Sequence, residues 1–296
     1  MADRSALGAT REVQVPNGTV VYQERGEGDP IVFVHGFLVD STLWRKVVPL
    51  LADDARCITP DWPLGSHRKA LNADADLTPT GLADHIVATL DALGIERATL
   101  VGNDSGGALC QITATRHPDR IARLVLTNCD AFDNFPPKAF RYLRLVAKTP
   151  GGLTAMTQSM RLPGAARAPI AFGGLTKRPI PGDVLRGWLE PAMSDKDVRR
   201  DARKVLLDMV SSYTLDAAAK LASFERPVLL PWGRDDRFFP FEHAERLAAI
   251  IPDARVVPIE DSRTFVSEDQ PEALADAIRA FLAETPAAAG EALSRA

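Results

Sequence analysis

The 296-residue chain has the composition of a globular protein with a substantial core, because 46% of its residues are hydrophobic and 25% are charged. A net charge of −4 gives no basic footprint for nucleic acid, and no apolar run is long enough to span a bilayer. The three widely spaced cysteines predict buried, reduced thiols and a cytoplasmic protein. We expect no metal, no cofactor, no nucleic-acid or membrane partner, and a monomer or homodimer that binds a small molecule.

Strand and helix signals alternate through the first half of the chain. Asn17-Gly18, between two strand-like runs, predicts a hairpin. The apolar and β-branched runs then predict strands at 31–34, 56–59, 98–101 and 121–128. Helical patterns lie at 41–51, 80–93 and 108–116, and Thr80 is the expected N-cap of the second. This order predicts an α/β fold with a mostly parallel central sheet flanked by helices.

The second half of the chain predicts a helical insertion followed by a return to the α/β core. Residues 134–223 contain helical pieces punctuated by Pro and Gly, and no convincing strand. Strand signals return at 227–232 and 255–259, and a helix is expected at 271–282. We therefore expect an α/β core formed by residues 1–133 and 224–286. A helical cap at 134–223 interrupts this core, and a flexible tail at 287–296 follows it.

The stretch Gly102-Asn103-Asp104-Ser105-Gly106-Gly107 joins a predicted strand directly to a predicted helix. Small residues at 102, 106 and 107 allow the sharp turn known as the nucleophile elbow, which places Asp104 at the nucleophile position. A carboxylate can attack carbon that bears a leaving group, and the helix N-terminus favours its ionised form. One alternative is that Asp104 only caps the helix. Another is that Ser105 is the nucleophile, but this would place Asn103 at a position where the turn needs a small residue.

With this elbow, with His35-Gly36-Phe37 after an early strand, and with this order of elements, residues 11–285 resemble the α/β-hydrolase fold. An Asp at the elbow is similar to haloalkane dehalogenases and epoxide hydrolases. The resemblance implies an Asp nucleophile, an oxyanion hole formed by the backbone N–H groups of Phe37 and Ser105, an acid, a His and a helical cap. Dehalogenases often place Trp and Asn where this chain has Ser105 and Phe37, so His35-Gly36-Phe37 looks more like epoxide hydrolases and general hydrolases.

The same resemblance assigns the remaining members of the triad. The segment from Pro227 to Pro240 is similar to the one that carries the acid, which spacing places at Asp236; Asp235 is the adjacent alternative and Asp130 a weaker one. The closing segment resembles Asp-x-Gly-His-Phe-x-x-Glu, but Thr264 stands at the His position. A threonine cannot act as a base near pH 7.

No histidine in the sequence replaces the missing one in the usual order, since none follows His243. His35 belongs to the oxyanion loop, and His67 lies on a loop that reaches the rim of the site. His85 and His117 fall on predicted surface helices, and His243 opens a helix. Without a base to activate water, an ester on Asp104 would hydrolyse slowly, because general-base assistance is typically worth ~10²–10⁴-fold.

The sequence thus predicts a hydrolase with an incomplete triad that acts on a small, mainly apolar molecule through Asp104. The alternatives are a non-hydrolytic member of the family (lyase, isomerase or cyclase) or a catalytically dead ligand-binding protein. Tyr142 and Tyr213, the only tyrosines of the insertion, and His35 are candidate pocket residues. Arginines 141, 144, 161 and 167 either meet an anionic substrate or form a solvated face.

Overall fold

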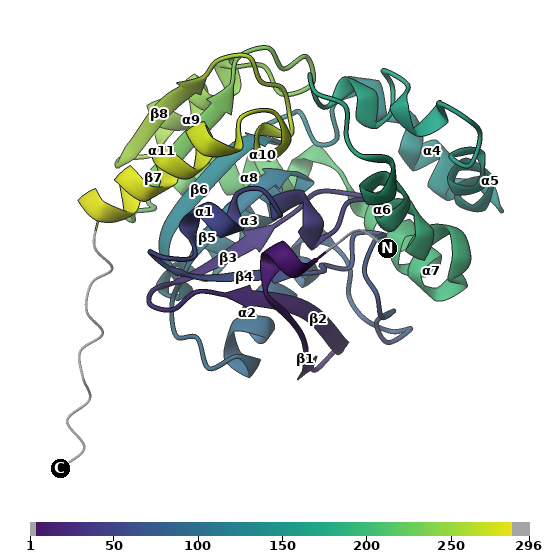
Figure 1. The fold of residues 1–296 in the computed structure, drawn as a ribbon, viewed down its shortest axis with the longest axis horizontal. Helices are drawn as coiled ribbons and strands as arrows, with labels where there is room; N and C mark the ends of the chain where they lie inside the picture. The colour runs from purple at the N-terminus through teal and green to yellow at the C-terminus, as the bar shows by residue number, and fades with distance from the viewer. Residues whose placement is uncertain (1–3, 286–296) are drawn as a thin grey trace.

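A central eight-stranded sheet organises the protein, as a computed structural model that describes residues 4–285 shows (Figure 1). Its strands are β1 (Ala9–Val15), β2 (Gly18–Arg25), β3 (Pro30–Val34), β4 (Arg56–Pro60), β5 (Ala98–Asp104), β6 (Ile121–Cys129), β7 (Val228–Gly233) and β8 (Ala254–Ile259). They lie in the order β1-β2-β4-β3-β5-β6-β7-β8. β2 pairs antiparallel with β1 and β4, and all other pairs are parallel, which confirms the predicted hairpin and sheet.

The helices of the fold are α1 (Val48–Leu51), α2 (Pro79–Ala92), α3 (Ser105–Arg116), α4 (Tyr142–Lys148), α5 (Gly152–Ser159), α6 (Gly182–Ser194), α7 (Lys196–Asp208), α8 (Ser211–Leu221), α9 (Glu242–Ile250), α10 (Val266–Asp269) and α11 (Pro271–Glu284). Strand residues alternate between two hydrophobic clusters: Val32 and Val34 pack with α2, α3 and α9, whereas Ile31 and Phe33 pack with α1 and α11. Both faces of the sheet are therefore buried, as expected of parallel strands.

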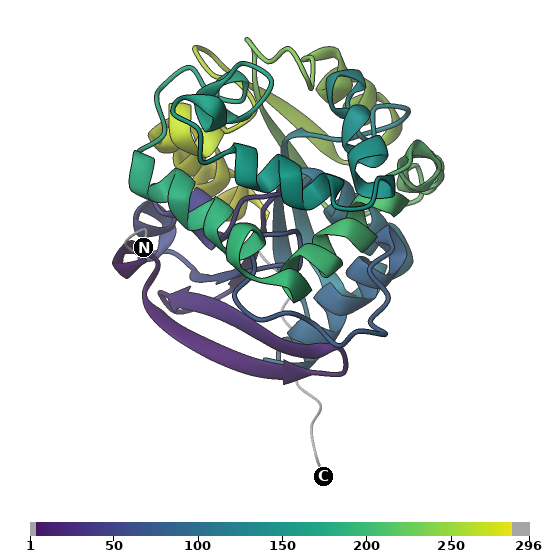
Figure 2. The same cartoon turned by 90° about the vertical axis from the view of Figure 1, so that its right-hand side faces the viewer.

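The described residues between β6 and β7 form helices and no strand, as expected for the insertion. α4, α5, α6 and α7 pack against one another and lie together beside the sheet (Figures 1 and 2). α8 instead packs against α3 and α9. It thus lies with the helices of the core, because Ala217 closes a small cluster with Ala83 and Ile112.

The structure differs from the sequence predictions in three local details. The helix expected at 41–51 is divided into a 3-10 turn at Ser41–Trp44, capped by Asp40, and the short α1, which begins beside Pro49. The N-cap of α2 is Thr78 and not Thr80, because Pro79 occupies the first helical position, where its missing N–H costs nothing. His85 is buried, since it lies on the face of α2 that contacts the core.

Other expectations concern the cysteines, the membrane and the tail. All three cysteines are buried and free of disulfide bonds, as predicted. Between residues 4 and 285, no helix is both long and apolar enough to cross a bilayer. The tail at 287–296 lies outside the described residues.

Candidate active site

The turn between β5 and α3 holds Asp104 in an unusual backbone conformation. Its φ of +55° and ψ of −134° lie outside the regions that non-glycine residues prefer, at a cost of about 1–3 kcal/mol. Neighbouring glycines make the turn possible. A Cβ atom on Gly106 would lie 2.3 Å from the Val34 carbonyl oxygen, and one on Gly102 would lie 2.7 Å from the Gly107 Cα. β5 therefore passes into α3 within one residue and lifts Asp104 above the end of the strand.

The Asp104 carboxyl group is held against the loop that follows β3. The backbone N–H groups of Phe37 and Ser105 lie near enough to this carboxyl group to lower its pKa. A Cβ atom on Gly36 would lie 2.1 Å from Asp104 Oδ2, so only glycine allows this close approach. The two N–H groups that the sequence assigns to an oxyanion hole thus both lie beside the Asp104 carboxyl group, where they stabilise negative charge.

Burial determines the charge of two neighbouring carboxyl groups. Burial, with a smaller contribution from the charge of the nearby Asp236, raises the pKa of Asp104 to about 7, although the backbone N–H groups of Ser105 and Phe37 oppose the rise. Asp130 follows β6, its side chain is almost fully buried, and its Oδ1 has no hydrogen-bond partner among the described residues. Burial, and then the charge of Asp104, raise the pKa of Asp130 well above its usual range. Burial therefore favours the neutral form of Asp130, while Asp104 titrates near neutral pH.

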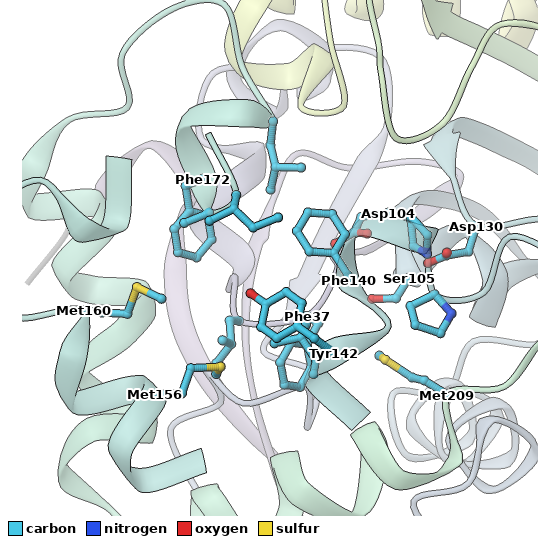
Figure 3. A pocket seen from close by; sticks show the side chains of 17 residues that line it. Phe37, Asp104, Ser105, Asp130, Phe140, Tyr142, Met156, Met160, Phe172 and Met209 are labelled. Carbon is cyan, nitrogen blue, oxygen red and sulfur yellow. The ribbon is translucent and has the colours of Figure 1, made fainter. Parts of the chain in front are cut away.

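Asp104, Ser105 and Asp130 lie together at one end of an apolar cavity of about 100 Å³ (Figure 3). The loop after β3 and the ends of β5 and β6 form its floor, and residues from 136 to 175 cover it, so the insertion lies over the carboxyl ends of these strands. Its remaining lining is mostly aromatic, aliphatic or Met: Phe37, Leu38, Pro136, Pro137, Phe140, Tyr142, Leu143, Met156, Met160, Ile170, Ala171, Phe172, Leu175 and Met209. Such a cavity suits a small apolar molecule.

Asp236 lies after β7, close enough for its charge to act on Asp104. Its Oδ1 accepts from the backbone N–H groups of Phe238 (2.8 Å) and Phe239 (3.2 Å), and its Oδ2 accepts from Asn128 Nδ2 (2.9 Å). Burial nevertheless raises the pKa of Asp236 to about 6.

Thr264 is fully buried, and its carbonyl oxygen accepts a 2.7 Å hydrogen bond from Asn103 Nδ2. Its hydroxyl group lies near enough to Asp236 to lower the pKa of that carboxyl, but Oγ1 makes no hydrogen bond of ordinary length and angle within residues 4–285. The structure thus brings together Asp236 and the residue at the expected His position.

Among residues 4–285, no histidine lines the cavity. The Nε2 atom of His35 accepts from the Trp62 backbone N–H at 2.9 Å, and Nδ1 lies 2.9 Å from the Gly36 carbonyl oxygen, so its ring is engaged with backbone. His67 Nε2 lies 3.2 Å from Asp201 on α7. The other three histidines also have partners: His117 contacts Asp84, His85 contacts Trp62, and His243 contacts Phe132.

Of the other pocket candidates, Tyr142 lines the cavity, whereas Tyr213 and His35 do not. Tyr213 packs instead against the Ala83–Ile112–Ala217 cluster, because α8 lies beside α3. Sequence reasoning considered Asp130 only as a weaker triad acid and missed its place in the cavity. The available signal was an acid at the carboxyl end of the strand beside β5, since ligands of parallel sheets bind at those ends. No motif marks Met156, Met160 or Met209.

The fold and the position of the cavity define the class of the protein. The sequence profile of the family described as alpha/beta hydrolase fold matches residues 29–271, and the chain belongs to that family. It is 30% identical over 294 residues to the cis-3-alkyl-4-alkyloxetan-2-one decarboxylase of Xanthomonas campestris pv. campestris, covering 92% of this chain and 94% of that protein.

Haloalkane dehalogenases are also similar to the chain. Haloalkane dehalogenase 2 of Mycobacterium bovis is 26% identical over 271 residues, covering 88% of this chain and 90% of that protein. Among solved structures, a putative ancestral haloalkane dehalogenase superposes with a TM-score of 0.78 at 26% identity, covering 94% of this chain and 100% of that chain.

Proposed function

We propose that the protein is an enzyme that uses Asp104 as a nucleophile towards a small, mainly apolar electrophile. The observation that carries this proposal is the position of the Asp104 carboxyl group, at the floor of an apolar cavity and beside the backbone N–H groups of Phe37 and Ser105. Its pKa near 7 leaves a large ionised fraction at neutral pH. A desolvated carboxylate in such a site attacks carbon without competition from bulk water.

The first step forms an ester on Asp104. A carboxylate oxygen bonds to the electrophilic carbon, and the bond from that carbon to a halogen or to an epoxide oxygen breaks. A halide leaves as an anion, whereas an epoxide oxygen takes up a proton. The neutral Asp130 carboxyl beside Asp104 is the proton donor in this scheme, and it becomes a carboxylate when it donates.

Trapping of the ester tests the nucleophile. The protein is incubated with a panel of haloalkanes and epoxides, and its intact mass and peptide map are measured. We expect an adduct on the peptide that contains Asp104, heavier by the mass of the epoxide or by the mass of the haloalkane less its hydrogen halide, and none on the Asp104→Asn variant. If no member of a broad panel gives an adduct, the protein is better described as a ligand-binding member of the family.

A comparison of epoxides with haloalkanes, which differ in their leaving groups, tests the role of Asp130. We expect Asp130→Asn to slow adduct formation from epoxides by about 10²-fold or more, because the proton donor is lost. Adduct formation from haloalkanes should change little, since a halide leaves without a proton. Equal slowing with both substrate classes would instead indicate that Asp130 only shapes the cavity.

A second candidate function is decarboxylation of an oxetan-2-one, a four-membered lactone. Two observations favour it: a relative of nearly equal length is named for this activity, and no histidine among the described residues lines the cavity to activate water. Asp104 would attack the saturated ring carbon that is bonded to the ring oxygen. Cleavage of the bond between this carbon and the ring oxygen would release a carboxylate. Loss of CO₂ then forms the alkene and breaks the Asp104 ester bond. The sequence of steps consumes no water and restores Asp104.

Product analysis separates the two candidates. Incubation with a cis-3,4-dialkyloxetan-2-one should yield the alkene and CO₂ if the second candidate is correct. A 3-hydroxy acid would indicate hydrolysis. Recovery of unchanged lactone, together with adducts from haloalkanes or epoxides, would leave only the first candidate.

A further inference from the structure

The insertion carries a strong positive charge that the proposed chemistry does not use. Residues 134–182 contain eight Lys and Arg residues and no Asp or Glu, in a chain whose net charge is −4. All eight are exposed: Lys138, Arg141, Arg144, Lys148, Arg161, Arg167, Lys177 and Arg178.

Carboxylates neutralise only two of these eight cations. Lys177 and Arg178 form ion pairs with Asp261, and Lys177 also pairs with Asp235. The other six form no ion pair with any carboxylate between residues 4 and 285. Arg141, Arg144 and Arg167 each donate to a backbone carbonyl group, which leaves their charge uncompensated.

The same segment carries most of the large exposed hydrophobic side chains. Of five such residues between 4 and 285, four lie here: Tyr142 (42% exposed), Leu145 (67%), Leu162 (64%) and Ile170 (50%). Single exposed apolar residues are common, but a group of them marks an interaction site. The fifth, Leu215, lies on α8.

Part of this surface borders the cavity. Tyr142 and Ile170 are exposed and also line the cavity, and Leu145 lies one turn after Tyr142 on the same side of α4. Met160 lines both the cavity and a shallow surface groove that contains Leu162. α4 and α5 lie on the outer side of the insertion, away from the sheet (Figures 1 and 2). We call the four exposed apolar residues and the six unpaired cations the cap face.

We propose that the cap face docks on an anionic lipid bilayer. Exposed aliphatic and Tyr side chains enter the headgroup boundary, and Lys and Arg side chains beside them attract anionic headgroups. A second copy of the chain is a poorer occupant, because two cap faces repel each other. An acidic polypeptide would satisfy the charges but leave Leu145 and Leu162 without an apolar partner. Docking also brings the cavity mouth to the phase into which apolar substrates partition.

This proposal adds a peripheral contact that the sequence analysis did not foresee. The expectation of no membrane partner rested on the lack of a spanning segment, and the helices of the structure agree with that observation. Binding at the surface of a bilayer requires no such segment.

Vesicle sedimentation tests the proposal on the full chain. We expect the protein to sediment with phosphatidylcholine vesicles that contain phosphatidylglycerol, to remain in solution with phosphatidylcholine alone, and to be released by added salt. The variant Leu145→Ser/Lys148→Glu on α4 should bind anionic vesicles about tenfold more weakly. Both side chains are exposed, so their replacement should not disturb the fold.

A matched control is available on α8. The variant Leu215→Ser/Lys220→Glu substitutes the same residue types with the same change of net charge on exposed residues of another surface, where it also removes the Lys220–Asp216 ion pair, and it should bind like the unaltered protein. Equal loss in both variants, or equal binding to neutral and anionic vesicles, would overturn the proposal. So would a dimer in solution that the α4 substitutions dissociate. Because sedimentation requires no turnover, its outcome is independent of the proposed reaction.

Discussion

At the residue scale, the site is governed by three buried carboxyl groups with unequal surroundings. Asp236 accepts three hydrogen bonds, Asp104 lies beside two backbone N–H groups, and Asp130 Oδ1 has no partner among the described residues. Burial raises the pKa of all three. Different pKa values in neighbouring carboxyl groups allow one to act as a nucleophile while another donates a proton.

The pKa of Asp104 predicts how adduct formation depends on pH. Only the ionised carboxylate is nucleophilic, so the rate should rise with pH through about 7 and level off above it. The rate of adduct formation from a haloalkane, measured by mass spectrometry over a pH series, checks this. A flat profile between pH values of about 5 and 8 would mean that Asp104 ionises at its ordinary pKa.

Replacement of Thr264 tests whether the site lacks only a base. Thr264 lies beside Asp236, which would orient an imidazole placed there. We expect Thr264→His to hydrolyse the Asp104 adduct ~10²–10⁴-fold faster than the unaltered protein. The half-life of the isolated adduct measures the effect. Thr264→Asn is the control, since it adds volume and polarity without a base, and a similar gain in that variant would contradict the explanation.

At the element scale, close packing of backbone against backbone determines the elbow. β3, β5 and α3 meet where Gly36, Gly102 and Gly106 leave no space for a Cβ atom. The positive φ of Asp104 persists because these contacts on either side fix the turn. The same glycines that were read in the sequence as a turn signal therefore act through tertiary contacts as well.

Adding a single methyl group at Gly106 tests whether the elbow has room for a Cβ atom. We expect Gly106→Ala to lower the free energy of unfolding by about 1–3 kcal/mol, because its Cβ would lie 2.3 Å from the Val34 carbonyl oxygen. Urea unfolding followed by circular dichroism measures the loss. Gly182→Ala at the start of α6 is the control: a Cβ atom there meets only the end of the Arg167 side chain, at 3.4 Å. Similar losses in both variants would rule out the elbow packing as the cause.

At the scale of the whole molecule, buried polar contacts tie the insertion to the core. Asp269, next to α11, accepts hydrogen bonds from the backbone N–H groups of Lys177, Arg178 and Arg263. Asp201 on α7 contacts His67 and the Leu71 backbone N–H. These contacts fix the cover over the cavity, so the shape of the site depends on segments far apart in the sequence.

The buried carboxyl groups also predict how global stability varies with pH. A folded pKa above the unfolded value stabilises the fold at low pH, and this contribution is lost as pH rises towards the folded pKa. The Asp130→Asn variant lacks one such group, so it does not lose this contribution as the pH rises. The free energy of unfolding of the variant, relative to that of the unaltered protein, should therefore increase with pH above about 4, by up to about 1.4 kcal/mol per pH unit. Urea unfolding of both proteins at several pH values measures the difference. A difference independent of pH would mean that Asp130 is not desolvated.

Much of the fold could be predicted from the sequence because local patterns encode it. Apolar runs such as 31–34 and 98–101 became β3 and β5, and the hairpin at Asn17-Gly18 formed as expected. Predictions that depended on distant partners were less successful. His85 faces the core, and the helix expected at 41–51 is divided.

By itself, the sequence determined the elbow at Gly102–Gly107, the order of the strands along the chain and the Thr at position 264, because each of these is a local property. Only the tertiary structure decided that Asp130 lies beside Asp104 in the cavity, that Tyr142 reaches the cavity while Tyr213 does not, and that six exposed cations of the insertion have no carboxylate partner among the described residues. The physical reason is that burial and electrostatic environment depend on which distant segments meet, and no local pattern specifies that.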